Sequence, residues 1–582
     1  MKNQIISADF IISIILFALL LNNPLLSQNP KQSIINVGNI TSWVSEEGFH
    51  DWIAGEKHWN GEYPKGKNVG VIFSEGLCWG GLVYDGQSQK VRVNGNTYGT
   101  GCAPNTRLFR VKYDFQNGNL RSDAASFFNK DINLVTFEDV EVIKQQYQKD
   151  WNEWPGNLGA PYLDKNNNGN YDPEVDVPGV PGALQTLWIN YNDNISESNY
   201  GSIPIGLEIQ ETYWAYAINT DLEDVIFRKA TLIYKGTSAS LPISIIDSMY
   251  ICLWSDTDLG YSADDFIGCD TTLNLGYTYN SNNSDQEYEK IGMKPPAVGN
   301  SYLQGSAYYT GNLSDSAIIN FKWKKGYKYF NDKPLTVAIL HRTGDYFSDP
   351  GFNYNGTLEF YNMMGGFLPV PRYPTQQLGI EFIGYGTYML PGDPVTGIGQ
   401  IDGITDVPGD RRMMLMSGPV NMHIGDTVEV VTALIGGIGK NNRSSISHLK
   451  YNAGIAKLFY DYFVESLTKG IVVSPQVENP DTIIYPSNYV LYQNYPNPFN
   501  STTTFRFEQP KDAYVTLTVY DVLGKEIAKV IDGNLLAGKH IITHNFIGLA
   551  SGVYFYQIKF SNEDGNLVED KLGKTMKFIL MK

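Results

Sequence analysis

A segment rich in aspartate and asparagine contains the side-chain oxygens that calcium requires. From Asp164 to Asp172, oxygen-bearing side chains stand at loop positions one, three, five and nine, and Gly169 stands at position six. Calcium takes about six to eight oxygen ligands, and a glycine at position six permits the sharp bend of an EF-hand loop. The spacing predicts a calcium loop whose ligands are Asp164, Asn166, Asn168, Asn170 through its backbone carbonyl, Asp172 and Asp176.

This segment departs from an EF-hand loop at its end. Val175 stands at position twelve, where an EF-hand has a bidentate glutamate, and Asp176 follows one residue later. Pro161 and Pro173 lie close to the loop and disfavour a pair of flanking helices. We therefore expect a standalone or dockerin-like structural calcium loop, and the alternative is an asparagine-rich turn that holds no ion.

A second acidic cluster directly follows a predicted buried strand. Carboxylates this dense repel one another unless a cation or hydrogen bonds neutralise them, and calcium is the simplest candidate. The alternative is the acid and base pair of a glycosidase, which requires carboxyl groups about 5–5.5 Å or about 6.5–9.5 Å apart. The members of this cluster are Asp256, Asp258, Asp264, Asp265 and Asp270.

Other reactive side chains indicate no recognisable catalytic motif. Asp410 stands beside Arg411 and Arg412, which predicts ion pairs that anchor loops. The seven histidines have no metal-binding spacing, and the sequence contains no nucleophile elbow, zinc-protease helix or phosphate-binding loop.

The elements that must position these residues are mainly strands. Alternating apolar and polar residues predict long antiparallel strands at 207–217, 225–234 and 243–253. A short apolar run predicts a buried strand at 428–435, and a helical apolar spacing predicts a helix over 442–467 that packs against the sheet.

The composition limits the classes of partner. The 582 residues carry a net charge of −17, and residues 488–582 contribute ten basic and nine acidic residues, so the remainder carries −18. Such a body repels nucleic acid and anionic membranes, and it suits divalent cations or neutral glycans. The 39 tyrosines favour strands and surfaces that stack on sugars, although a β-rich secreted surface has the same composition.

The C-terminal hundred residues contain a series of short motifs. A strand-like alternation at 513–520 and 553–560 predicts a small β-sandwich around them. The motif residues are Tyr495, Pro496, Asn497, Pro498, Asp521, Gly524, Gly552, Tyr554 and Lys577. Their order and spacing resemble the C-terminal sorting domain, type A, of the type IX secretion system of Bacteroidota-like Gram-negative bacteria. Segments 206–276 and 393–450 are similar to the body of uncharacterised secreted proteins that carry this domain.

The resemblance implies an export route and a location. The expected partners are the type IX secretion machinery and, outside the cell, a surface glycolipid or an extracellular polysaccharide, with no nucleic acid. The sorting domain is usually removed after export, so the protein is expected in the medium or on the outer-membrane surface.

The N-terminus predicts a secretory signal peptide. Lys2 precedes an apolar run at 10–21, which is too short to cross a hydrocarbon core of about 30 Å, and Ser27 offers a small residue for cleavage. An uncleaved membrane anchor is the alternative.

The four cysteines form two pairs that are local in sequence. Export through the periplasm permits disulfides, and we predict Cys78 with Cys102 and Cys252 with Cys269, one of three possible pairings. No spacing typical of a zinc site accompanies them.

These observations predict a mainly β protein. We expect a signal peptide (1–27), an N-terminal β-rich region (28–150), a central sandwich-like body with calcium-type loops (151–470), a linker (471–487) and an immunoglobulin-like sorting sandwich (488–582). The body contains one or two β-sandwich-like domains with long loops and a few helices. Its expected role is that of a secreted or surface binding, adhesion or structural protein, and the alternative is a secreted polysaccharide-degrading hydrolase.

Overall fold

The computed structural model describes residues 31–51, 61–195, 201–217, 220–342, 349–369, 387–472, 488–511, 513–535, 538–561 and 575–581. The predicted signal peptide and almost all of the predicted linker lie outside these residues. No helix in these ranges is long and apolar enough to cross a membrane.

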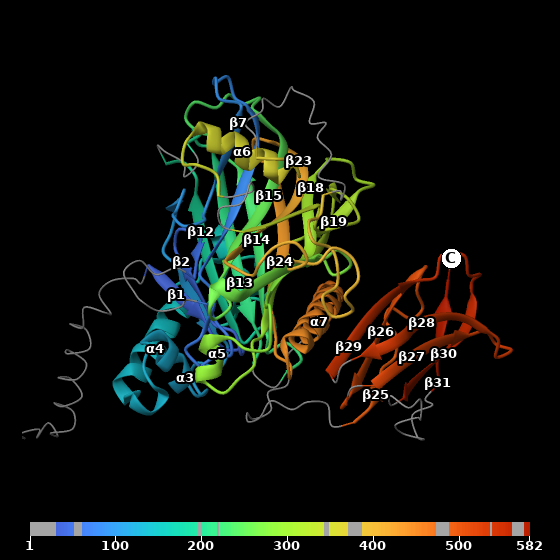
Figure 1. Cartoon of the computed structure of the whole chain (residues 1–582). Helices are drawn as coiled ribbons and strands as arrows, with labels where there is room; N and C mark the ends of the chain where they lie inside the picture. The colour runs from blue at the N-terminus through green and yellow to red at the C-terminus, as the bar shows by residue number, and fades with distance from the viewer. Residues whose placement is uncertain are drawn as a thin grey trace, which may run out of the picture.

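Two antiparallel sheets face each other and form the body (Figure 1). The first sheet has the order β1 (Gln32–Ile35), β2 (Ser42–Ser45), β3 (Phe49–His50), β6 (Ser74–Tyr84), β15 (Ile245–Thr257), β23 (Arg411–His423) and β22 (Val337–Arg342), with β7 (Val91–Gly95) paired to β6. The second has the order β16 (Asp265–Asp270), β17 (Leu275–Asn280), β18 (Ala297–Tyr309), β24 (Thr427–Gly437), β14 (Val225–Tyr234), β13 (Leu207–Ala215), β12 (Gln185–Asn192) and β8 (Ala103–Pro104), with β9 (Phe109–Lys112) on β12 and β21 (Tyr327–Tyr329) on β18.

The main core lies between these two sheets. Trp79, Ile251 and Leu415 of the first sheet and Leu232 and Val430 of the second are all buried in one cluster. Strands from both sides of residue 150 take part in each sheet, so this position does not separate one sheet from the other. The mainly β, sandwich-like fold predicted from alternation is confirmed.

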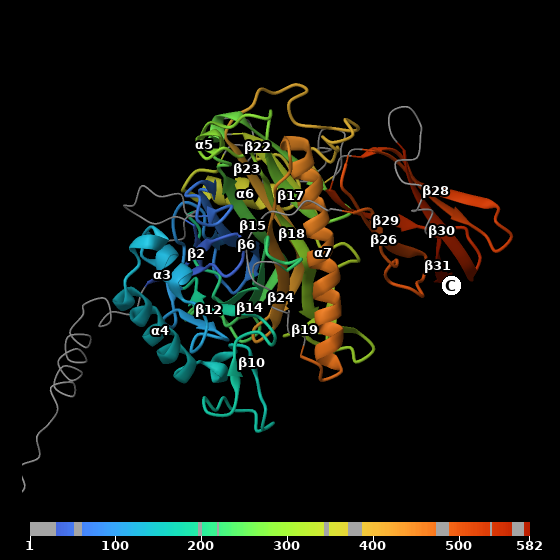
Figure 2. The same cartoon turned by 90° about the horizontal axis from the view of Figure 1, so that it is seen from below.

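One long helix, several shorter helices and three hairpins complete the body. α7 (Asn442–Thr468) begins at a capping box in which the Asn441 side chain accepts from the Ser444 backbone N–H, and it packs on the outer face of the second sheet (Figure 2). The remaining elements are α3 (Arg121–Phe127), α4 (Phe137–Asn152), α5 (Gln286–Lys290), α6 (Tyr354–Met364), and the hairpins β4 (Gly61–Glu62) with β5 (Gly70–Ile72), β10 (Tyr162–Leu163) with β11 (Val177–Pro178), and β19 (Ser316–Ile319) with β20 (Lys322–Lys325).

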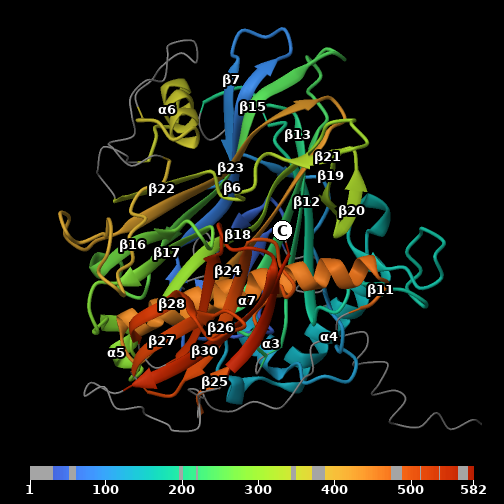
Figure 3. The same ribbon diagram turned by 90° about the vertical axis from the view of Figure 1, so that its right-hand side faces the viewer.

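The C-terminal region is a separate small sandwich with its own core. One sheet contains β25 (Val490–Leu491), β26 (Thr502–Gln509) and β29 (Gly538–Asn545), and the other contains β28 (Glu526–Leu535), β27 (Ala513–Tyr520), β30 (Gly552–Ser561) and β31 (Thr575–Leu580). Phe505, Leu517 and Phe578 are among the buried residues between them. This sandwich lies beside α7, where Ile541 of β29 joins the apolar cluster beneath the helix (Figure 3).

Candidate metal centre

The end of β15 and the start of β23 bring three aspartates together. The antiparallel register pairs Asp256 with Arg412, so Asp258, just beyond β15, comes close to Asp410, just before β23. One carboxylate oxygen from each of Asp256, Asp258 and Asp410 lies within 4.8 Å of the others. Oxygen ligands of this kind suit calcium, magnesium or manganese.

Arg412 is the cation that this cluster already contains. Its Nη1 lies 2.8 Å from Asp410 Oδ1, its Nη2 lies 3.3 Å from Asp256 Oδ2, and its Nε lies 3.1 Å from Asp349 Oδ2. The Tyr98 hydroxyl donates to Asp256 Oδ2 at 2.8 Å. Three carboxylates therefore pair with one guanidinium, and Asp258 lies close to them, which leaves an excess of negative charge when all four are ionised.

The pKa values of these carboxyl groups reflect this excess. Burial raises the pKa of Asp256 well above its ordinary value, and Asp258 and Asp410 add to the effect although Arg412 opposes it. Burial, with the neighbouring Asp410, raises the pKa of Asp258 to about 7. Burial also raises the pKa of Asp349. A bound divalent cation would remove the repulsion and lower these pKa values.

One oxygen of the cluster has no hydrogen-bond partner in the described part of the chain. Asp256 is only 2% exposed, and its Oδ1 is buried without a donor. Buried polar atoms in native proteins almost always have a partner, so this oxygen has a vacant acceptor position. A cation held jointly with Asp258 and Asp410 would fill it.

The other members of the predicted second cluster are not among the three aspartates whose oxygens converge. Asp264 accepts a hydrogen bond from Asn280 Nδ2 at 2.9 Å, and burial raises its pKa to about 6. Asp265 is buried, and its Oδ2 accepts from the Leu259 backbone N–H at 3.0 Å. Asp270 forms an ion pair of 3.0 Å with Lys450 of α7. These three residues are close to Asp256 in sequence. Asp265 and Asp270, however, lie on β16, which belongs to the second sheet.

Asp410 is the member of the centre that the sequence did not predict as a ligand. The predicted ion pairs are confirmed, since Asp410 pairs with Arg412 and Asp402 pairs with Arg411 at 2.7 Å. The cross-strand register between β15 and β23 brings Asp410 to Asp258, across about 150 residues of sequence. A pocket of about 100 Å³ opens near the same strand ends, lined in part by His341, Asp402 and Arg411.

The predicted first calcium loop is closed by the β10–β11 hairpin and not by helices. The Asp164 carboxylate accepts from the backbone N–H of Gly169 at 2.9 Å, and Asp172 Oδ2 accepts from the side-chain amides of Asn166 and Asn168, each at 2.7 Å. Both carboxylate oxygens of Asp176 accept backbone N–H groups. Gly169 has φ +76°, as a sharp bend requires. Five predicted ligand side chains thus take part in one loop network; calcium binding there stays a proposal.

The predicted disulfides are not formed among the described residues. All four cysteines are buried thiols, and none is in a disulfide. Cys78 of β6 lies opposite Cys252 of β15 in the first sheet, whereas Cys269 belongs to β16 of the second. Proximity in sequence therefore did not predict which cysteines lie close together, because the consecutive strands β15 and β16 belong to different sheets. Burial raises the pKa of the Cys102 and Cys252 thiols.

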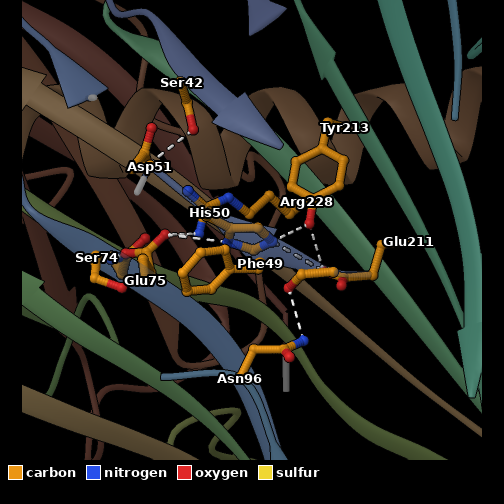
Figure 4. A network of polar contacts seen from close by, with 12 residues as sticks. Ser42, Phe49, His50, Asp51, Ser74, Glu75, Asn96, Glu211, Tyr213 and Arg228 are labelled. Atoms are coloured by element: carbon orange, nitrogen blue, oxygen red, sulfur yellow. Dashed lines mark hydrogen bonds and ion pairs between the residues drawn. The ribbon is translucent and has the colours of Figure 1, made fainter. Parts of the chain in front are cut away.

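A buried ionic network between the two sheets was not predicted from the sequence (Figure 4). Glu75 of β6 forms an ion pair with Arg228 of β14, and His50 lies 3.9 Å from Glu75 and 3.8 Å from Glu211. Tyr213 donates to Glu211 at 2.7 Å. All five side chains are buried, so the network joins the sheets. The sequence did contain one indication of this network. Glu211 is a charged residue at a position of β13 that faces the core, between Ile209 and Tyr213, and such a residue requires a buried partner.

Burial and charge oppose each other in this network. Burial alone would raise the pKa of Glu75, but Arg228 and His50 outweigh it and hold that pKa at about 2. At Asp51 the opposing effect of Arg228 is too weak, and burial with the nearby Glu75 raises its pKa to about 7.

The motif residues of the C-terminal sandwich fix its turns and edges. Asp521 accepts from the N–H groups of Leu523 and Lys525 and closes a turn in which Gly524 has φ +81°. The Lys577 carbonyl accepts from the Asn497 side-chain amide at 3.2 Å, which joins the Tyr495–Pro498 segment to β31.

This sandwich identifies the class of protein. Residues 493–569 match the family described as the secretion system C-terminal sorting domain. The chain therefore carries a type IX secretion C-terminal sorting domain, which indicates a secreted or cell-surface protein that engages the type IX machinery.

Similarity to other known proteins is slight. No curated protein sequence matches the chain. Among solved structures, CopC from Methylosinus trichosporium OB3b is similar at 20% identity and TM-score 0.12, over 16% of this chain and 93% of that one. A polysaccharide lyase is similar at 6% identity and TM-score 0.18, over 64% of this chain and only 34% of that one. Likenesses this slight carry no argument about function.

Proposed function

We propose that the exported body is a calcium-binding β-sandwich that attaches to an extracellular polysaccharide, with calcium as a structural ion. The observation that carries the proposal is the centre formed by Asp256, Asp258 and Asp410, with oxygens within 4.8 Å of one another and a vacant acceptor on Asp256. The sorting domain supports it by giving the location, because the protein works outside the cell.

Calcium at this centre would join the loops at one end of the sandwich. It would link the residues after β15 to those before β23, and Tyr98 would hold the loop after β7 against the same carboxylates. A loop that is ordered before binding loses less entropy on meeting a ligand, which is how a structural ion improves a binding surface.

The test is calcium-dependent unfolding of the full chain, together with metal analysis of the purified protein. Calcium at about 100 times its dissociation constant stabilises a one-site protein by about 2.7 kcal/mol, so Tm should be higher in calcium than in chelator. The Asp258→Asn variant should lose the part of this calcium-dependent difference that the Asp256, Asp258 and Asp410 centre contributes, and metal analysis should find one calcium ion fewer. Asp461→Asn on α7, which lies in a partly exposed ion pair with Lys457, serves as the matched control and should keep it.

A calcium effect that is equal in wild type and Asp258→Asn would place calcium elsewhere and overturn the assignment. The hydrolase hypothesis is less well supported, because Asp256 and Asp410 already form ion pairs with Arg412. Release of reducing sugar that disappears in Asp258→Asn would nevertheless favour the hydrolase.

A further inference from the structure

The β19–β20 hairpin and the residues that follow it are basic, in contrast to the rest of the chain. Residues 316–333 contain five lysines and one aspartate, a local charge of +4 in a protein of net charge −17. All four side chains of β20 are exposed, so this strand is accessible on both faces. The lysines, all exposed, are Lys322, Lys324, Lys325, Lys328 and Lys333.

Aromatic rings lie among these lysines. Trp323 of β20 is 54% exposed and Tyr309 at the end of β18 is 48% exposed. Lys324 Nζ lies 4.8 Å from the centre of the Tyr327 ring, and that ring packs edge-on against Tyr309 at 5.3 Å. Figure 3 shows β19, β20 and β21 together at one edge of the body. Amphipathic rings and ammonium groups thus lie on one hairpin, with Trp323 and Lys325 on one exposed face of β20 and Lys322 and Lys324 on the other; we call this segment the lysine hairpin.

The positive charge of the lysine hairpin is not neutralised locally. Among the described residues, none of its five lysines forms an ion pair with a carboxylate. Lys322 and Lys324 are two positions apart on one strand, so their side chains point to the same face and repel each other. An anionic ligand would relieve that repulsion.

We infer that the lysine hairpin binds an anionic polysaccharide, a chain of sugar rings that carry carboxylates. The inference rests on the proposed function and specifies its ligand class. The lysines would pair with the carboxylates, and the exposed face of Trp323 would cover the apolar face of a sugar ring.

The charge of the whole molecule favours a thin, flexible ligand over a broad one. Charges in solution act over about 8 Å at physiological ionic strength. A nucleic-acid duplex or an anionic bilayer is wide enough to come within this distance of the acidic remainder of the body, which repels it. A single polysaccharide chain can contact the lysine hairpin alone.

Affinity electrophoresis of the full chain in gels containing polygalacturonate tests the inference. Dextran is the neutral control, and chelator in the gel removes any bridge through calcium. We expect retardation by polygalacturonate that weakens with added salt, and none by dextran. A triple Lys322→Gln, Lys324→Gln, Lys325→Gln variant should lose at least tenfold in affinity, and Trp323→Ala should lose several-fold.

The matched control removes the same charge elsewhere. A triple Lys67→Gln, Lys165→Gln, Lys290→Gln variant changes three other exposed lysines and should keep the wild-type affinity. Equal losses in both triple variants would mean that net charge alone governs retardation and would overturn the inference. Unchanged affinity with new self-association in the hairpin variant would also overturn it, because the lysines would then only protect an exposed strand edge.

Two further measurements test the class of ligand and the independence of the two sites. Tighter binding to single-stranded DNA or to vesicles of anionic lipid than to polygalacturonate would replace the polysaccharide by another class of ligand and overturn the inference. Asp258→Asn should bind polygalacturonate in chelator as wild type does, so a failure of the calcium proposal leaves this result intact. Loss of binding in that variant would overturn the independence of the two sites.

Discussion

Asp258 is the residue whose protonation should control the metal centre. Burial raises its pKa to about 7, far above the value near 4 expected in the unfolded chain. A carboxyl group whose folded pKa is raised stabilises the fold most below its unfolded pKa, and this contribution is lost as the pH rises through the folded pKa. Without calcium, the stability that Asp258 contributes should therefore fall between about pH 4 and pH 7.

Calcium should reverse the direction of this pH dependence. Only the carboxylate binds the ion, so the increase of Tm caused by calcium should grow as the pH rises through about 7. Thermal unfolding between pH 5 and pH 8, in calcium and in chelator, measures both trends. Asp51 and Asp224 also have pKa values of about 7, so the difference between wild type and Asp258→Asn isolates the one group. A calcium effect that is constant over this range would contradict the prediction.

Glu75 should be among the side chains whose loss is most costly. Glu75→Gln leaves Arg228 buried without its carboxylate, and loss of one partner of a buried ion pair costs about 3–5 kcal/mol. Chemical denaturation at pH 7 should show this loss, and Glu138→Gln on the exposed start of α4 should change stability by less than about 0.5 kcal/mol.

The pH dependence of the Glu75 contribution has the opposite sign to that of Asp258. Its pKa is held at about 2, below the unfolded value, so its stabilisation is present above about pH 4.5 and is lost as the pH falls toward 2. The difference in the free energy of unfolding between wild type and Glu75→Gln should therefore become smaller as the pH falls. A difference that does not change with pH would indicate a packing defect instead.

At the scale of elements, the hairpin formed by β10 and β11 holds the predicted first calcium loop as a unit. Asp164→Asn keeps an oxygen that can accept from Gly169 but removes a charge from the loop, so it should cost little in chelator and more in calcium. Metal analysis should find one calcium ion fewer than in wild type. An equal loss of stability in both conditions would exclude a calcium site in this loop.

Strand alternation made most of the body predictable at this scale. The segments predicted at 207–217, 225–234 and 243–253 correspond to β13, β14 and β15, because one face of each packs in the core. β15 continues four residues past the predicted end, to Thr257. Asp256 is therefore a strand residue, and the polar end of the strand carries it into the metal centre.

At the scale of the whole molecule, the sorting sandwich contacts the body through α7. A Cβ added at Gly454 would lie 2.7 Å from Ile541 Cδ1 of β29, so a larger side chain there collides with the sandwich. Gly454→Leu should displace the sorting domain and increase the radius of gyration of the full chain in small-angle X-ray scattering. The body itself should gain up to about 1 kcal/mol, because leucine favours the helix more than glycine.

Lys457→Leu on the same helix is the control for added apolar surface. Its side chain is 41% exposed, so this variant should leave the scattering curve unchanged. An unchanged curve in Gly454→Leu would mean that the sandwich adapts to the larger side chain without moving.

The sequence by itself determined the export route, the β-rich class and the residue types of the candidate ion sites. These properties depend on local patterns: motif order, alternation along a strand, and the spacing of oxygens within one loop. The loop at Asp164–Asp176 could be predicted because its side chains interact within thirteen residues of one another.

The tertiary structure alone decided which distant residues meet. Asp410 joins Asp256 and Asp258 through the pairing of β15 with β23, and Glu75 meets Arg228 across the two sheets. The predicted cysteine pairing was wrong because it rested on sequence proximity. The lysine hairpin is a local feature of residues 316–333, and it was not predicted because only the net charge of long segments was considered. Proximity in sequence does not determine which strands pair or in which register. The net charge of −17 is a sum over the whole chain and does not reveal a local positive patch. Such contacts arise from packing between segments more than a hundred residues apart, which a local pattern does not encode.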